Sequence, residues 1–125
     1  MINLKKNEEQ IEKNAKTCAE QDIILPTYAQ MADPSTIPAD IVDELKSIDR
    51  DAVHSRNLFR VTWQNETVES GGGFGDINYL EIPPEISGVK ARIIGLVGKY
   101  FPTGAHKVGA AFSCLAPTLI TGQFN

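Results

Sequence analysis

Residues 103–109, which read Thr-Gly-Ala-His-Lys-Val-Gly, constrain the fold more than any other part of this chain. They follow residues 89–97, a nearly continuous apolar run that is typical of a strand covered on both faces. They precede small and apolar residues that predict a helix beginning near Lys107. A strand, a glycine-containing turn and a helix form the leading half of an α/β crossover unit, so we expect a mostly parallel sheet.

Helices are expected in the preceding part of the chain. Residues 5–21 are mostly charged and carry a thin apolar stripe at helical spacing, which predicts a surface helix that leans on a larger body. Pro38 and Asp40 suit the first turn of a second helix. The apolar face of that helix consists of Ile41, Val42, Leu45 and Ile48.

The periodicity changes to two in residues 58–64, where Phe59, Val61 and Trp63 alternate with polar residues. This alternation predicts a half-buried strand with Trp63 in the core or at an interface. We therefore expect an N-terminal helical region over residues 1–56 and the start of an α/β domain over residues 57–125.

Size and composition exclude several classes of partner. A chain of 125 residues with 42% hydrophobic content is expected to form at most one domain. Its net charge is −4, and no run of lysine and arginine is interleaved with aromatics, so nucleic acid is not an expected partner. We expect neither a secretory signal nor a membrane span. Cys18 and Cys114 belong to no CxxC pair, and we expect reduced thiols in a cytoplasmic protein.

Three further sequence features suggest sites, but each is better explained structurally. The glycine loop at residues 70–76 could form an anion nest, yet it lacks the third glycine of G-x-G-x-x-G and is interpreted as a surface hinge. His54 has no histidine or cysteine at ligand spacing, so no metal site is predicted and a solvent-facing or helix-end histidine is expected. Cys114 is expected to pack as a small apolar residue in the last helix.

Lys107 is the candidate for chemistry. Helix-start amides, a protonated His106 and the small apolar neighbours would all favour its free amine over the ammonium. A neutral amine can attack an aldehyde, so Lys107 could form a Schiff base. The alternative is a lysine that extends from the helix end into water.

The string from Thr103 to Lys107, followed by the small-residue helix at 108–112, resembles the cofactor-lysine motif of fold-type II pyridoxal-phosphate enzymes. The tryptophan synthase beta chain and its cysteine-synthase-like relatives are the family members in question. Residues 57–60 through 122–124 also resemble the N-terminal region of these relatives. The resemblance implies part of a three-layer α/β fold, in which residues 57–125 begin the cofactor-binding domain.

The resemblance also implies a function. Lys107 would hold pyridoxal 5'-phosphate as an internal aldimine and move the proton at the substrate alpha carbon, and His106 would help to anchor the cofactor phosphate. The chemistry would be a lyase-like beta-elimination or beta-replacement on a small amino acid. The family's phosphate cup and substrate loop follow the lysine by more than the eighteen residues present here, so the isolated chain is expected to be an inactive leading portion.

An alternative function is a non-catalytic chain that completes a larger assembly. It would supply a strand and a helix to a complementing chain or to another copy of itself.

Overall fold

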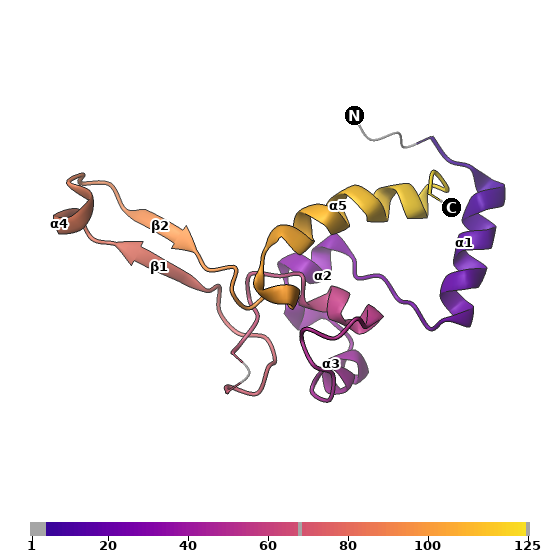
Figure 1. Ribbon diagram of the computed structural model, residues 1–125, viewed down its shortest axis with the longest axis horizontal. Coiled ribbons are helices and arrows are strands. Elements are labelled where there is room, and N and C mark those ends of the chain that lie inside the picture. Colours follow the sequence, from indigo (N-terminus) through magenta and orange to yellow (C-terminus); the bar gives the residue numbers. More distant parts are fainter. Residues whose placement is uncertain (1–4, 68, 125) are drawn as a thin grey trace.

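The computed structural model describes residues 5–67 and 69–124, and in these residues short helices are combined with one two-stranded sheet. Most helices lie together, whereas the sheet extends away from them as an arm (Figure 1). The α-helices are α1 (Glu8–Glu20), α2 (Tyr28–Ala32), α3 (Ala39–Leu45), α4 (Pro84–Ser87) and α5 (Lys107–Ile120). The 3₁₀ helices are η1 (Pro34–Thr36), η2 (Ser55–Arg60) and η3 (Pro102–Gly104), and the strands are β1 (Tyr79–Ile82) and β2 (Ile93–Leu96).

Helix α1 confirms the predicted surface helix. The side chain of Asn7 caps it by accepting a hydrogen bond from the backbone amide of Gln10 at 3.3 Å. None of its residues is buried, and it leans on α5 through Asn14, whose side-chain amide donates to the carbonyl of Leu119 at 3.1 Å. A thin apolar stripe thus gives a helix held at the surface, because it has little apolar area to bury.

Helix α3 forms after Pro38 as predicted and supplies much of the core, but it ends at Leu45, so Ile48 of the predicted apolar face lies beyond it. Ile41 and Leu45 are buried on its inner face, where they pack with Ile37 and Phe59. Burying an aliphatic or aromatic side chain of this size stabilises the fold by roughly 1.5–3 kcal/mol. The hydrophobic cluster formed by these four residues is therefore small, but its side chains are well buried.

The strand predicted at residues 58–64 is wrong. This segment begins inside η2 and continues through a bend, with Phe59 and Val61 buried beside equally buried Arg60 and Thr62. Alternation predicts a strand only when the polar set faces water, and here both sets face protein. Trp63 is half-buried. The expected boundary between residues 56 and 57 falls within η2, whose Phe59 packs on α3.

The sheet is also different from the expectation of mostly parallel strands. Strands β1 and β2 pair antiparallel, with Tyr79 opposite Leu96 and Ile82 opposite Ile93. The short connection through α4 suits antiparallel pairing, whereas parallel strands need a longer crossover. The arm is not covered on both faces as predicted, since Ile94 and Leu96 remain about half exposed (47% and 53%). The described chain thus combines helices with a sheet, but the pairing is antiparallel.

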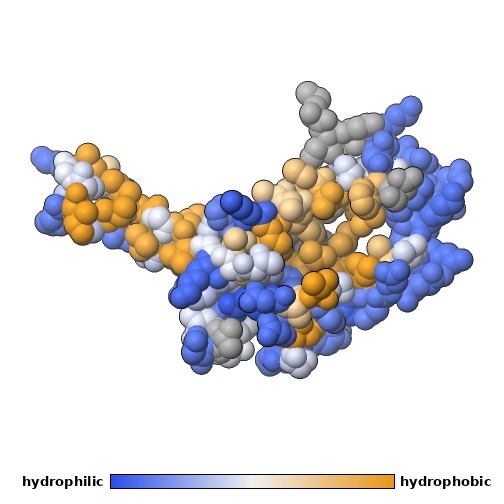
Figure 2. All heavy atoms as spheres, viewed as in Figure 1, coloured by the Kyte–Doolittle hydropathy of each residue, from blue (hydrophilic) through white to orange (hydrophobic). Residues whose placement is uncertain are grey.

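Helix α5 begins at Lys107, where the sequence predicts it, and continues through Pro117. Its buried residue Phe112 packs edge-on against Tyr28 of α2, with ring centroids 6.1 Å apart. Apolar residues spread over the visible face of α5 and along the arm (Figure 2). None of the helices in the described ranges is long and apolar enough to cross a membrane.

Candidate functional site

The turn that precedes Lys107 has an unusual backbone. Thr103 and Gly104 both adopt left-handed conformations, with φ of 65° and 70°. This conformation is natural for glycine but rare for a residue with a Cβ, so the rest of the structure must hold Thr103 in place. One such contact comes from Asp51, whose Oδ1 accepts a hydrogen bond from the Thr103 amide at 3.0 Å. A segment fifty residues earlier therefore helps to fix the turn.

Aromatic packing positions His106. Its ring stacks on Trp63 with centroids 5.7 Å apart and an interplanar angle of 27°. Trp63 in turn meets Phe101 edge-on at 4.9 Å. A Cβ on Gly98 would lie 2.9 Å from the Cβ of His106, so only glycine allows this close approach. His106 thus has a defined place although its side chain is exposed.

Lys107 is the first residue of α5 and is exposed. Beside it lies a hollow of about 340 Å³ whose lining residues include His106, Trp63 and Phe101 but not Lys107. Of the two interpretations that the sequence left open, the exposure of Lys107 agrees with a lysine that extends from the helix end into water, and the described residues do not shield its amine. What the fold does provide is an exposed lysine directly after His106, which lines an aromatic hollow.

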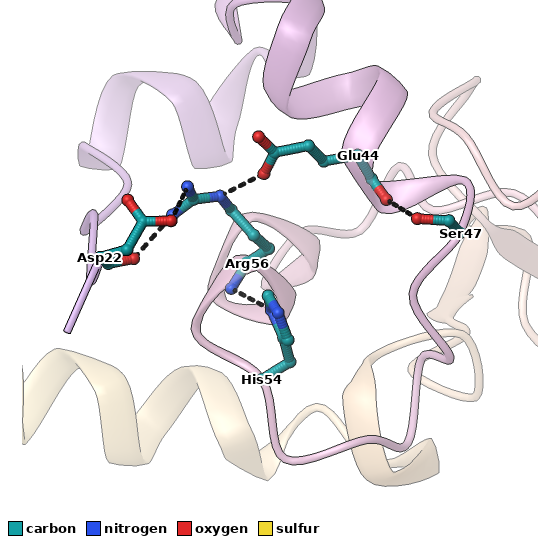
Figure 3. Close-up of polar contacts among 5 residues, drawn as sticks. All are labelled: Asp22, Glu44, Ser47, His54 and Arg56. Atoms are coloured by element: carbon teal, nitrogen blue, oxygen red, sulfur yellow. Dashed lines mark hydrogen bonds and ion pairs between the residues drawn. The ribbon is translucent and has the colours of Figure 1, made fainter.

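The other sequence candidates fall outside this site. His54 is exposed and confirms the expected helix-end position, because its Nδ1 accepts a hydrogen bond from the Arg56 amide at 3.1 Å (Figure 3). Cys114 was expected to pack, but it is exposed because the described residues do not cover that face of α5. The glycine loop borders a separate groove that also contains Gly104.

Two buried arginines of η2 were missed by sequence analysis. Arg56 makes ion pairs with Glu44 at 2.6 Å and with Asp22 at 2.8 Å (Figure 3). The hydrogen bond to Glu44 is the main cause that raises the pKa of the Arg56 guanidinium. Arg60 lies deeper, and burial together with the nearby positive charge of Arg50 lowers its pKa. No sequence signal marks either arginine, because each depends on partners distant along the chain.

Comparisons of the chain with protein-family models, with curated proteins and with solved structures gave no match.

Proposed function

We propose that this chain is the N-terminal portion of a fold-type II pyridoxal-phosphate-dependent enzyme in which Lys107 holds the cofactor. The observation that carries the proposal is that Lys107 opens α5, directly after a tight turn, with its amine accessible. The residues of that turn, Thr103 to His106, are those of the family motif. Lysine at this position can condense with an aldehyde and release water.

The proposal is supported by a hollow beside His106, the residue that precedes Lys107. The hollow beside His106 has a volume within the range of roughly 300–1,000 Å³ that is common for small-molecule sites. His106 is fixed by its stacking on Trp63 and could donate a hydrogen bond to the cofactor phosphate. When bound, the cofactor would supply an electron sink for elimination or replacement at the beta carbon of a small amino acid. Both cysteines are free thiols, which suits the cytoplasmic location included in this proposal.

The proposal is tested by covalent labelling, which does not require turnover. The chain is mixed with pyridoxal phosphate, reduced with borohydride and digested, and the modified lysines are identified by mass spectrometry. We expect Lys107 to be modified in preference to the other lysines. The variant Lys107→Ala should lose this adduct, whereas Lys90→Ala, which removes an exposed lysine on the arm, should keep it. Equal labelling of all exposed lysines would contradict the proposal.

A second candidate function, a chain that completes a larger assembly, is favoured by the exposed apolar surface. On the arm, Tyr79, Leu80, Ile94 and Leu96 are each about half exposed. Leu115 and Ile120 of α5 are similarly exposed. Surfaces of this kind commonly mark interfaces.

Sedimentation velocity tests this candidate. The chain should form a concentration-dependent complex, either with itself or with an added complementing chain, and the double variant Leu80→Lys with Leu96→Lys should weaken it. Lys107→Ala should leave association unchanged, which separates this function from cofactor binding. A monomer that binds nothing and is indifferent to the arm variant would argue against it.

A further inference from the structure

Arg60 carries a charge that the described residues bury without an ion pair. Only 4% of its surface is exposed. Its Nη1 donates to Ile48 O at 2.9 Å and Asn57 Oδ1 at 2.8 Å. Its Nη2 donates to Leu45 O at 2.6 Å and, at the longer distance of 3.5 Å, to Gly72 O. Its Nε is buried without a partner, and no carboxylate among the residues that the structure describes forms an ion pair with it. A buried cation of this kind is costly unless an anion compensates it.

A second guanidinium converges on the same place. Arg50 donates from Nη2 to Glu66 O at 2.6 Å, and its Nε is also buried without a partner. A Cβ built on Gly72 would lie 3.9 Å from the Nη2 of Arg60 and 4.0 Å from the Nη2 of Arg50. Burial is the main cause that lowers the pKa of Arg60, the like charge of Arg50 lowers it further, and the nearby Asp49 raises it. The glycine, with φ of +67°, keeps this point free of a side chain.

Both arginines line a groove of about 590 Å³ between the glycine loop, the segment after α3 and the segment before η3. Two lysines also line the groove. Lys46 is already paired with Asp43 at 2.6 Å, whereas Lys99 lies near the ring of Tyr100, 5.6 Å from its centroid. Among the described residues, Arg50, Arg60 and Lys99 are therefore the cations of this groove that form no ion pair, although Asp49 lies near Arg60, and Glu69 lies near Lys99 and Arg50.

The groove contains three carboxylates, and each has a backbone donor. Asp51 accepts from the amide of Thr103 at 3.0 Å, and Asp49 accepts from the amide of Asp51 at 2.8 Å. The Glu69 carboxylate has a lowered pKa because its own backbone amide and the Thr67 side chain bind it, with smaller contributions from Lys99 and Arg50. The exposed Glu69 thus interacts with Lys99 and Arg50, whereas Asp49 interacts with Arg60.

We propose that this groove is a phosphate-binding site in which Arg50, Arg60 and Lys99 supply the positive charge. A phosphate group suits these groups because its several oxygens can accept from guanidinium forks and an ammonium that approach from different sides. The site is independent of the proposed cofactor attachment, since Lys107 does not line the groove. The phosphate can be inorganic or belong to a small phosphate ester, and the open position at Gly72 is where its oxygens would meet the two arginines.

The test is a titration of the full chain with inorganic phosphate, and separately with glycerol phosphate, at constant ionic strength. Binding is followed by NMR through the amides of residues 71–73 and the Nε–H of Arg50. We expect saturable shifts confined to the groove, and the ligand that binds more tightly identifies the source of the phosphate. Arg50→Gln should weaken binding about tenfold and Lys99→Gln about threefold, because each removes one charge-assisted contact.

Matched variants separate this site from general attraction of anions. Lys90→Gln removes the same charge from the arm and should leave affinity unchanged. Glu69→Gln removes the competing carboxylate and should strengthen binding severalfold. Lys107→Ala should have no effect, so failure of the cofactor proposal would leave this result intact.

The proposal is overturned if the shifts are uniform and do not saturate, or if Lys90→Gln weakens binding as much as Arg50→Gln does. Arg50 contributes a hydrogen bond to the loop, so Arg50→Gln is used only if its spectrum shows the native fold. If it does not, the titrations of the two variants at exposed positions test the proposal. Lys99→Gln must weaken phosphate binding and Glu69→Gln must strengthen it, and any other pair of results refutes the site.

Discussion

Arg56 and Arg60 lie four positions apart in η2, and each is only 4% exposed, yet their surroundings differ fundamentally. Arg56 meets the carboxylates of Asp22 and Glu44, which are themselves 81% and 49% exposed. Arg60 meets backbone carbonyls and an amide oxygen, and it lies near another guanidinium. Two arginines of one short helix therefore differ in their partners, because carboxylates form ion pairs with Arg56 but not with Arg60.

The opposite pKa shifts express this difference. The pKa of Arg56 is raised, chiefly by the hydrogen bond to Glu44, whereas that of Arg60 is lowered, chiefly by burial. Arg56 is a completed structural ion pair that joins α3 to the segment after α1. Arg60 holds the chain together through neutral acceptors, and no carboxylate among the described residues forms an ion pair with it.

The largest effect should come from Arg60→Ala. Its removal leaves the carbonyls of Leu45 and Ile48 and the side chain of Asn57 without their donor in the interior. We expect the free energy of unfolding in urea to fall by about 3 kcal/mol or more. Arg56→Ala is the matched control and should cost less, because Asp22 and Glu44 can return to water. Equal losses for the two variants would remove the distinction between the arginines.

Glu44 is one of the two carboxylates that pair with Arg56, and its removal should lower the free energy of unfolding by about 2 kcal/mol. Glu44→Ala deletes the shorter contact, 2.6 Å to Nε, and leaves a covered guanidinium with one carboxylate. The expected value lies between those for surface and buried pairs because Glu44 is half exposed. Asp22→Asn should cost less than about 1 kcal/mol, since Asp22 is mostly in water and its carbonyl still accepts from Arg56 at 3.0 Å. Urea denaturation that ranks the two variants in reverse would show that exposure does not set their contributions.

Phosphate should stabilise the native chain through the groove beside Arg60. At a phosphate concentration ten times the dissociation constant, the gain is about 1.4 kcal/mol by mass action. The melting temperature should rise with phosphate in Glu44→Ala as it does in the unsubstituted chain, but not in Arg50→Gln. If phosphate still raises the melting temperature of Arg50→Gln, or if chloride raises that of the unsubstituted chain equally, the anion binds elsewhere.

The smallest expected effect on stability comes from Arg92, an exposed arginine that can be compared with the buried Arg56 and Arg60. It binds Glu81 of β1 through Nε at 2.9 Å and Nη2 at 3.0 Å, and the hydrogen bond to Arg92 lowers the pKa of Glu81. A depressed carboxyl pKa contributes stability above its unfolded value, about 4.3, and loses it as the pH falls through the folded value. Amide shifts of β1 and β2 should therefore change toward disordered values below that pH, and Arg92→Gln should abolish the dependence. If the amide shifts of β1 and β2 do not depend on pH, the Arg92–Glu81 pair contributes nothing to the stability of the arm.

The candidate site was predictable in part. The start of α5 at Lys107 follows from the glycine turn and the small residues after it, which are local signals. The stacking of His106 on Trp63 was not predictable, because it joins residues more than forty positions apart. For Lys107 the sequence left both a shielded and an exposed side chain open, since apolar neighbours in sequence do not show whether other segments will cover it.

By itself, the sequence determined the elements that depend on neighbouring residues: the surface helix α1, α3 after Pro38 with its buried Ile41 and Leu45, and the beginning of α5. Only the tertiary structure decided that β2 pairs antiparallel with β1 and that the segment around Arg60 is a 3₁₀ helix covered on both sides. The physical reason is that capping and helical periodicity act within a few residues. Strand pairing and the burial of a charge are decided by which distant groups come to lie within hydrogen-bonding distance.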